Sequence, residues 1–281
     1  MNTKIGNKVF NFGEKTYIMG ILNITPDSFS DGGEFVQIDK AVAMAKNMAN
    51  WGADILDIGG ESTRPGAGKI TTQEELARVI PVIKAIRKNL SIPISIDTTK
   101  STVAQAAIQA GANLVNDISA ATFDQQMLST VAQLNAPLIL MHIKGTPQTM
   151  QQQTNYQDLM AEITEFLANR IQAAIAAGIP ADKLIIDPGI GFAKDFGQNI
   201  ELLRRLADLK KLGTPILVGT SRKSFIGHIL NKKQPKERVW GTAATVVAAI
   251  ANGADILRVH DVAEMVDVSR VADKIYRIYR D

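Results

Sequence analysis

The chain has 281 residues, no cysteine and a net charge of +3 from 31 basic and 28 acidic residues. The lack of cysteine excludes a disulfide framework, a thiolate nucleophile and any metal site that needs sulfur ligands. The small charge excess and an aromatic content of 5% argue against a nucleic-acid surface. Residues 1–13 do not have the pattern of a secretory signal, and the most apolar stretch, Ala243–Ala251, is too short to span a membrane. We therefore expect a cytoplasmic protein.

Short apolar runs rich in Ile, Val and Leu recur along the chain. A continuous run of this kind, without polar alternation, is typical of a parallel strand that is covered on both faces. In chain order, the expected strands are Tyr17–Asn23, Asp54–Ile58, Ile92–Asp97, Asn113–Asp117, Pro137–His142, Lys183–Asp187, Pro215–Gly219 and Asp255–His260.

Most stretches between these runs have the apolar period of an amphipathic helix. The clearest expected helices are Ile38–Trp51, Tyr156–Ala177 and Asn199–Leu212. Another helix should begin with a capping box formed by Thr72 and Glu75, and Pro81 should kink it. Three helices should end in a glycine that is followed at once by a strand, at Gly52, Gly111 and Gly253.

The alternation of strands and helices predicts the fold class. Eight strand–helix units in 281 residues fit a (β/α)8 TIM barrel, and no linker-like stretch divides the chain. We therefore expect a single barrel domain over residues 1–281. A doubly wound parallel sheet is the alternative.

Polar side chains stand at the carboxyl ends of the expected strands, where a barrel builds its active site. They are Asn23, Asp57, Asp97, Asn116, His142, Asp187, the loop Ser221–Ser224, Arg258 and His260. Any one of them could be a hydrogen-bonded structural residue. Polar groups gathered at one rim are costly to desolvate unless they bind a ligand or one another. As a set, they predict a binding site.

These side chains fall into two chemical groups. Asp97, Asn116 and Asp187 suit the donor-rich edge of a flat heterocycle, because carboxylates accept paired N–H bonds and an amide both donates and accepts. The second group consists of cations and donors that suit phosphate: Lys223, Arg258 and His260. Thr63 and the backbone amides of Gly59 and Gly60 would add to this anion site.

Two loop segments carry the most specific signal, 20–33 (GILNITPDSFSDGG) and 57–66 (DIGGESTRPG). Both closely resemble the signatures of dihydropteroate synthases. Further matches follow in family order: Ile96–Thr98, Asn116–Ser119, Met141–His142, Asp187–Phe192, Ser221–Gly227 and Arg258–His260. The chain is identified as a member of this family from Lys15 to its end.

The resemblance implies a transferase of folate biosynthesis and a target of sulfonamides. Such an enzyme condenses 6-hydroxymethyl-7,8-dihydropterin diphosphate with 4-aminobenzoate and releases 7,8-dihydropteroate and diphosphate. The C–O bond breaks first, and the arylamine then attacks a cation delocalised into the pterin. Mg²⁺ is the implied cofactor, the small-molecule substrates are the implied ligands, and a homodimer is the implied assembly.

The resemblance also assigns roles to residues. Asp97, Asn116, Asp187 and Lys223 should hold the pterin, and Asp97 and Lys223 should be catalytic. Thr63, Arg258 and His260 should bind the diphosphate, and Asn23, whose neutral oxygen suits a partly hydrated Mg²⁺, should ligate the metal. Arg64, Pro65, Phe192 and Ser224 should form the aminobenzoate pocket.

Two other functions remain as alternatives. A methyltetrahydrofolate:corrinoid methyltransferase shares the strand-end Asp and Asn pattern but has no reason to keep both loop signatures. A catalytically silent pterin-binding paralogue should have lost part of the loop or anion set. Lys144, after the Met141–His142 motif, departs from the family pattern, and the segment 193–196 is given no role.

Overall fold

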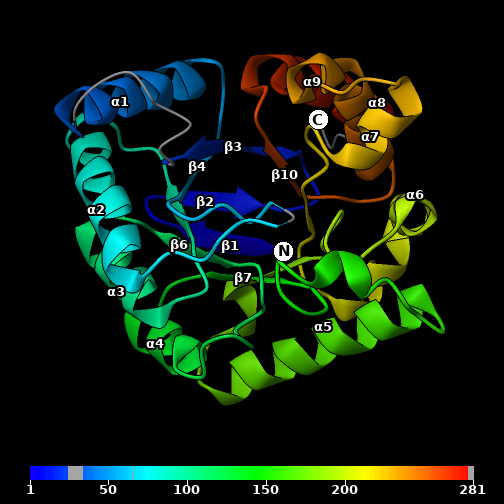
Figure 1. Cartoon of the computed structure of the whole chain (residues 1–281), viewed down its shortest axis with the longest axis horizontal. Helices are drawn as coiled ribbons and strands as arrows, with labels where there is room; N and C mark the ends of the chain where they lie inside the picture. Colours follow the sequence, from blue (N-terminus) through cyan, green and yellow to red (C-terminus); the bar gives the residue numbers. More distant parts are fainter. Residues whose placement is uncertain (25–33, 65, 278–281) are drawn as a thin grey trace.

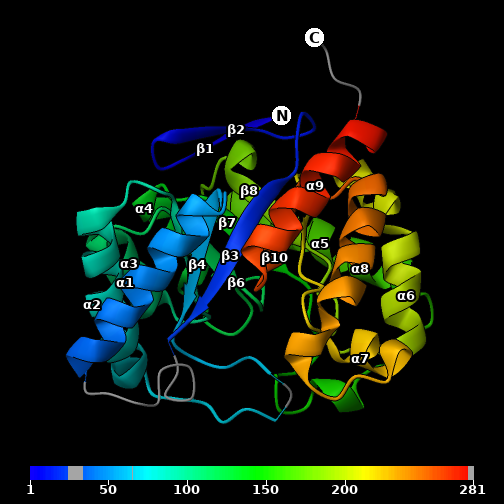
Figure 2. The same cartoon turned by 90° about the horizontal axis from the view of Figure 1, so that it is seen from above.

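A computed structural model describes residues 1–24, 34–64 and 66–277 of the chain. Its centre is a parallel barrel of eight strands surrounded by helices (Figures 1 and 2). The strands are β3 (Tyr17–Asn23), β4 (Ile55–Gly59), β5 (Ile94–Asp97), β6 (Leu114–Asp117), β7 (Leu138–Met141), β8 (Leu184–Asp187), β9 (Leu217–Val218) and β10 (Ile256–Val259). Each expected strand is therefore confirmed, close to its expected bounds.

The helices outside the barrel follow the strands in alternation. They are α1 (Glu34–Asn50), α2 (Thr72–Asn89), α3 (Ser101–Ala110), α4 (Met127–Leu134), α5 (Leu159–Ala176), α6 (Phe196–Arg204), α7 (Ser224–Leu230), α8 (Val239–Ala251) and α9 (Val262–Tyr276). Short 3-10 helices are η2 (Met150–Gln152), η3 (Ala181–Lys183), η4 (Leu206–Leu212) and η5 (Pro235–Arg238). Among the described residues, none of these helices has the length and apolarity that a membrane crossing requires.

The strand order confirms a (β/α)8 barrel and excludes the doubly wound alternative. The order is β8-β7-β6-β5-β4-β3-β10-β9, so each strand lies beside its neighbour in sequence or across the point where β3 meets β10. A parallel bridge between Ile186 and Ile216 closes the ring. The pairing places Gly59 opposite Asp97 and Asp97 opposite Asn116, so polar strand ends lie side by side.

The helix boundaries agree with most of the expected signals. Gly52, Gly111 and Gly253 all have positive φ angles (103°, 116° and 92°), as the helix-ending role requires. The expected helix Asn199–Leu212 is divided into α6 and the 3-10 helix η4. Helix α2 continues through Pro81.

The predicted capping box of Thr72 and Glu75 is wrong by one residue. Thr71 is the N-cap, and its side chain accepts a hydrogen bond from the Glu74 backbone N–H while Glu74 bonds back to Thr71. The sequence has threonine and glutamate each in tandem, so the same spacing fits two registers. Glu75 is instead fully buried and forms an ion pair with Lys100.

A hairpin of β1 (Asn2–Ile5) and β2 (Lys8–Asn11), which the sequence did not indicate, covers the amino end of the barrel (Figure 2). Phe10 packs on Tyr17 with ring centroids 4.6 Å apart, and both rings join the core inside the barrel. This end is therefore filled with apolar side chains. The strand carboxyl ends and their loops lie at the opposite end.

Candidate active site

The predicted heterocycle ligands lie together at the carboxyl end of the barrel. Asp97, Asn116 and Asp187 end β5, β6 and β8, or stand one residue before the end, and all three are buried. Asp187 Oδ1 accepts a hydrogen bond of 2.7 Å from the Gly189 backbone N–H. Parallel strands bring these ends to one rim, so the expected grouping of acceptor side chains is present.

Arg258 joins two of the strand-end carboxylates. Its Nε donates to Asp57 Oδ2 and its Nη2 donates to Asp97 Oδ2, both at 2.6 Å. Asn116 Nδ2 donates to the same Asp57 oxygen at 3.3 Å. Asp57 Oδ1 is buried and has no hydrogen-bond partner among the described residues. The guanidinium is thus fixed by charge-assisted bonds at the centre of the mouth.

The carboxylates at this site are poorly solvated. Burial raises the pKa of Asp97 to about 7, against the opposing effect of Arg258 and with the help of Asp57. Burial also raises the pKa of Asp187 to about 6, although the Gly189 N–H favours its charged form. Raised carboxyl pKa values of this kind are typical of functional sites.

Lys223 and Phe192 lie together on the other side of the mouth. Lys223 Nζ is 4.2 Å from the centroid of the Phe192 ring, a cation–π contact. A Cβ on Gly191 would lie 3.0 Å from Lys223 Cδ, so this glycine lets the lysine stem lie close over the loop. Burial, with Arg258 adding to it, lowers the pKa of Lys223 to about 8.

His260 stands beside this group of cations. Its backbone N–H donates to Ser221 Oγ at 3.1 Å, and its Nδ1 is 3.0 Å from the same hydroxyl. Burial lowers the pKa of His260 to about 3, and Arg222, Arg258, Arg64 and Lys223 lower it further. The imidazole is therefore neutral before an anion binds. The neighbouring arginine and lysine side chains are donors that can bind that anion.

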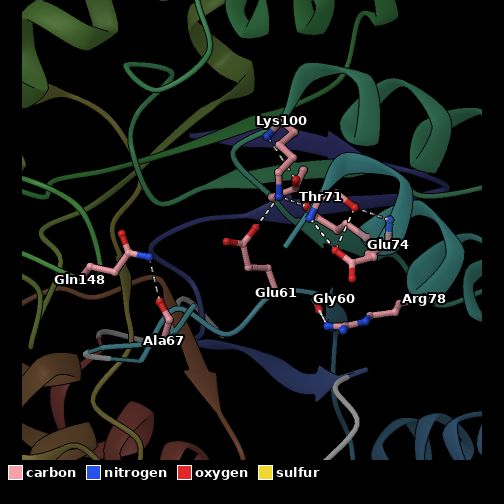
Figure 3. Close-up of polar contacts among 10 residues, drawn as sticks. Gly60, Glu61, Ala67, Thr71, Glu74, Arg78, Lys100 and Gln148 are labelled. Atoms are coloured by element: carbon pink, nitrogen blue, oxygen red, sulfur yellow. Dashed lines mark hydrogen bonds and ion pairs between the residues drawn. The ribbon is translucent and has the colours of Figure 1, made fainter. Parts of the chain in front are cut away.

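Loop residues 60–71, here named the β4 loop, carry Thr63 and Arg64, and the ends of the loop are held by polar contacts (Figure 3). Lys100 forms ion pairs with Glu61 and with buried Glu75, the second at 2.5 Å. Further along, Gln148 Nε2 donates to the Ala67 carbonyl at 3.3 Å. Arg64 itself is exposed and Thr63 is half-buried.

A cavity of about 550 Å³ lies between the β4 loop and the loops that follow β5 and β6. Asp97, Thr63, Lys100 and Ile118 are among its lining residues. The cavity therefore connects the predicted pterin side with one of the predicted diphosphate residues.

Two of the remaining predicted residues, both within the described part of the chain, do not bond to this group. Asn23 ends β3, Ser224 is exposed at the start of α7, and within the described residues neither side chain bonds to the other predicted ligands. Pro65 and segment 25–33 of the first signature lie outside the described residues.

The sequence interpretation gave no role to several residues that the structure brings into the site. Asp57 was noted at a strand end, and its pairing with Arg258 explains its burial. Lys194 is 2% exposed and lies 3.0 Å from His142 Nδ1, inside the loop that carries Phe192. Lys144, which departs from the family pattern, bonds to Glu162 at 2.6 Å. Their partners are distant in sequence, so no local pattern marked them.

Comparison with known proteins gives a consistent answer. Residues 19–260 match the family described as pterin binding enzyme. A dihydropteroate synthase from Synechocystis sp. is 57% identical, over 97% of this chain and 94% of the relative.

Solved structures agree with this match. The Yersinia pestis dihydropteroate synthase with a sulfonamide drug complex has a TM-score of 0.92 at 42% identity, covering 98% of this chain and 99% of that one. The Xanthomonas albilineans dihydropteroate synthase with 4-aminobenzoic acid also has a TM-score of 0.92 at 42% identity, covering 99% of both chains. With the barrel, the strand-end ligands and both loop signatures, these matches show that the chain belongs to the pterin-binding enzymes, within the family of dihydropteroate synthases.

Proposed function

We propose that the mouth of this barrel joins 6-hydroxymethyl-7,8-dihydropterin diphosphate to 4-aminobenzoate, releasing 7,8-dihydropteroate and diphosphate. The observation that carries the proposal is the cluster in which Arg258 bridges Asp57 and Asp97 beside Asn116. Buried acceptors for a heterocycle and a fixed cation for its anionic tail lie there in direct contact. The transferase activity is the one by which the relatives are named.

The pterin ring is assigned to the acceptor side chains. Asp97, Asn116 and Asp187 present two carboxylates and an amide, and an aminopyrimidinone edge supplies the matching N–H donors. Desolvation makes bonds to these carboxylates stronger than they would be in water. Lys223, held against Phe192 at the same rim, contributes a donor to the ring.

The diphosphate is assigned to Arg258, His260 and Thr63. Arg258 uses Nε and Nη2 for its two carboxylate partners, and within the described residues its Nη1 has none, so this atom is available to a phosphate oxygen. The donors are fixed before the reaction begins, which is the requirement for electrostatic stabilisation of a leaving anion. The Asp97 carboxylate then offsets the positive charge that develops on the pterin as the C–O bond breaks.

The proposal includes a Mg²⁺ ion that binds together with the diphosphate. The described residues contain no group of three or more His, Asp or Glu side chains able to hold a metal by themselves. Asn23, at the end of β3, offers one amide oxygen. This donor set fits a hydrated Mg²⁺ that takes most of its oxygens from water and phosphate. When bound, the ion would neutralise charge on the leaving group.

The aminobenzoate is assigned to Phe192, Arg64, Pro65 and Ser224. Phe192 provides an apolar face at 9% exposure, and Ser224, at the start of α7, provides a hydroxyl for the carboxylate. The support comes from the Xanthomonas albilineans relative solved with 4-aminobenzoic acid. The Yersinia pestis relative solved with a sulfonamide supports inhibition of this chain by the same drug class.

The assembly is proposed to be a homodimer. The apolar helix segments Ala243–Ala251 and Val262–Val271 could supply the interface, but they already place Val246, Ala249 and Met265 in the core. Apolar side chains that stay exposed on α7, α8 and α9 are the candidates for the contact, among them Ile229 at 56%, Trp240 at 77% and Val271 at 62%. Sedimentation equilibrium of the chain and of Trp240→Lys would measure this. Cytoplasmic location stays a prediction of the sequence.

The test of the function is a diphosphate-release assay from which each substrate and Mg²⁺ are omitted in turn. Release should require all three, and 7,8-dihydropteroate should be the product. Pterin binding without product would instead identify a silent paralogue. Asp97→Asn should lower turnover about a hundredfold or more, because a charge aimed at the transition state is lost. Asp267→Asn, on the exposed face of α9, is the matched control, and near-normal turnover of Asp97→Asn would contradict the assignment.

A further inference from the structure

The loop between β8 and α6, residues 188–195, carries Phe192 and is here named the β8 loop. It is built around one buried amine. Lys194 Nζ donates to the Phe192 carbonyl at 2.8 Å and lies 3.0 Å from His142 Nδ1. The side chain is 2% exposed, so this amine is held inside the protein at the back of the loop.

The backbone on each side of Phe192 is also fixed. The Gly191 N–H donates to Asn199 Oδ1 at 2.6 Å, and Tyr156 donates its hydroxyl to the Ala193 carbonyl at 2.9 Å. Gly191 and Ala193 both have positive φ angles, 81° and 52°, so the chain coils tightly around the amine. Three successive residues thus have their backbone bound from within the protein.

The partners of the Lys194 amine are neutral groups. One is a carbonyl, and the other is the His142 imidazole, whose pKa burial lowers to about 2. Burial, with the positive charges of Lys223 and Lys144, lowers the pKa of Lys194 to about 7, while Asp187 acts in the opposite direction. Burying an amine among such partners is unfavourable compared with an apolar side chain of the same length. The position must therefore be used for something other than stability.

The role of Lys194 is indicated by the position of the Phe192 ring on the β8 loop. Its Phe192 ring faces Lys223, whose Nζ is 4.2 Å from the ring centroid. The ring belongs to the same buried apolar cluster as Ile118 and Met141. A change in the Phe192 backbone would move the ring with respect to the mouth. Asp97, Asn116 and Asp187 would stay in place because strands hold them.

We propose that Lys194 is a positioning residue for the aminobenzoate substrate, which sets the Phe192 ring through the bond to the Phe192 carbonyl. The inference rests on the aminobenzoate pocket proposed above. It separates the two substrates: the β8 loop positions the arylamine, and the strand ends position the pterin. Lys194 itself touches neither substrate.

The test is Lys194→Met, which keeps the length of the side chain and removes the amine. The KM for 4-aminobenzoate should rise about tenfold, the size expected from a misplaced contact that loses one hydrogen bond. The dissociation constant of the pterin diphosphate should stay within about twofold, because within the described residues Lys194 forms no hydrogen bond with a pterin ligand and affects Asp187 only through its charge. Lys183→Met is the matched control, since its amine also donates to a backbone carbonyl, that of Asn135, but at the amino end.

A second variant keeps the proposal decidable if Lys194→Met does not fold. Tyr156→Phe removes one hydroxyl from the Ala193 carbonyl and keeps the ring, and it should raise the KM for 4-aminobenzoate about threefold. Unchanged KM values in the folded variants, or equal weakening of both substrates, would overturn the inference. Failure of the proposed function would be seen separately, as absence of product from the unaltered chain.

Discussion

The two loops that carry predicted aminobenzoate residues are held in opposite ways. The β4 loop has exposed residues along most of its length, and ion pairs of Lys100 with Glu61 and Glu75 hold it near its start. The β8 loop is buried along most of its length and is bound from within by Lys194. The comparison teaches that one wall of the pocket is held by bonds from inside the protein, while the other is held mainly through contacts of its partly exposed residues, at Glu61 and Ala67.

A matched pair of glycine substitutions should give the largest difference between the loops. Gly189 and Gly66 have similar φ angles, 73° and 78°, so alanine meets the same backbone strain of about 1–2 kcal/mol in both. A Cβ on Gly189 would lie 2.0 Å from the His142 carbonyl oxygen, whereas a Cβ on Gly66 meets nothing within 4 Å.

Gly189→Ala should therefore cost about 3 kcal/mol or more in the free energy of unfolding, and Gly66→Ala about 1 kcal/mol. Urea denaturation of both variants measures this difference. Equal costs would show that the β8 loop can move away from His142, and the contrast between a buried and an exposed wall would be lost.

Loss of the ion pairs at the base of the β4 loop should have the next largest effect. Lys100→Met leaves the Glu75 carboxylate, which is 0% exposed, without its cation. The unfolding free energy should fall by about 3 kcal/mol, at the lower end for a broken buried pair because Lys100 is partly exposed. The double variant Lys100→Met with Glu75→Gln buries no charge and should recover most of the loss. No recovery would mean that the cost comes from packing.

The pH dependence of stability should distinguish the two anchoring lysines. Burial lowers the pKa of Lys194 to about 7, so the unfolded chain binds more protons between pH 7 and about 10.4, and the contribution of this group to stability rises with pH over that window. Burial also lowers the pKa of Lys100, but Glu61 and Glu75 outweigh it and raise the pKa overall. Its contribution is full below the unfolded pKa and is lost only above it.

This is checked by urea denaturation at pH 7 and at pH 9.5, the second being about 1 unit below the lysine pKa of the unfolded chain. The unfolding free energy of the unaltered chain minus that of Lys194→Met should increase from pH 7 to pH 9.5. The same difference for Lys100→Met should stay constant. If both differences stay constant, the Lys194 amine is charged in the folded protein and its neutral surroundings tolerate that charge.

The smallest effect should come from the far end of the β4 loop. Gln148→Ala removes the bond to the Ala67 carbonyl, which is exposed and long at 3.3 Å. Stability should change by about 0.5 kcal/mol or less. A measurable rise in the KM for 4-aminobenzoate without a change in stability would show that this contact orders the loop around the ligand.

The sequence was sufficient for the barrel and for the gathering of polar strand ends at one rim, because both depend on local patterns. Each apolar run is a self-contained signal, and the barrel places every strand end on one rim, so Asp97, Asn116 and Asp187 could be grouped without coordinates. The capping box failed because Thr71–Thr72 and Glu74–Glu75 fit two registers, and only the contact of Glu75 with Lys100 selects one of them.

The partners of the site residues could not be predicted from the sequence. Asp57 and Arg258 are 201 positions apart, and Lys194 and His142 are 52 apart. No pattern within a helix or strand reports such a pair, because the pairing depends on which barrel positions face each other. The amino-terminal hairpin was missed for a different reason, since its two short strands mix polar and apolar residues and lack the continuous apolar run that marked the barrel strands.

The β1–β2 hairpin closes the amino end of the barrel and leaves the carboxyl end open. Phe10, Phe12 and Tyr17 fill the amino end, so the described residues leave no passage along the barrel axis. Both substrates must enter, and both products must leave, by the same mouth. The molecule that binds deepest must bind first and be released last. The order of binding and release therefore follows from the depth of each pocket.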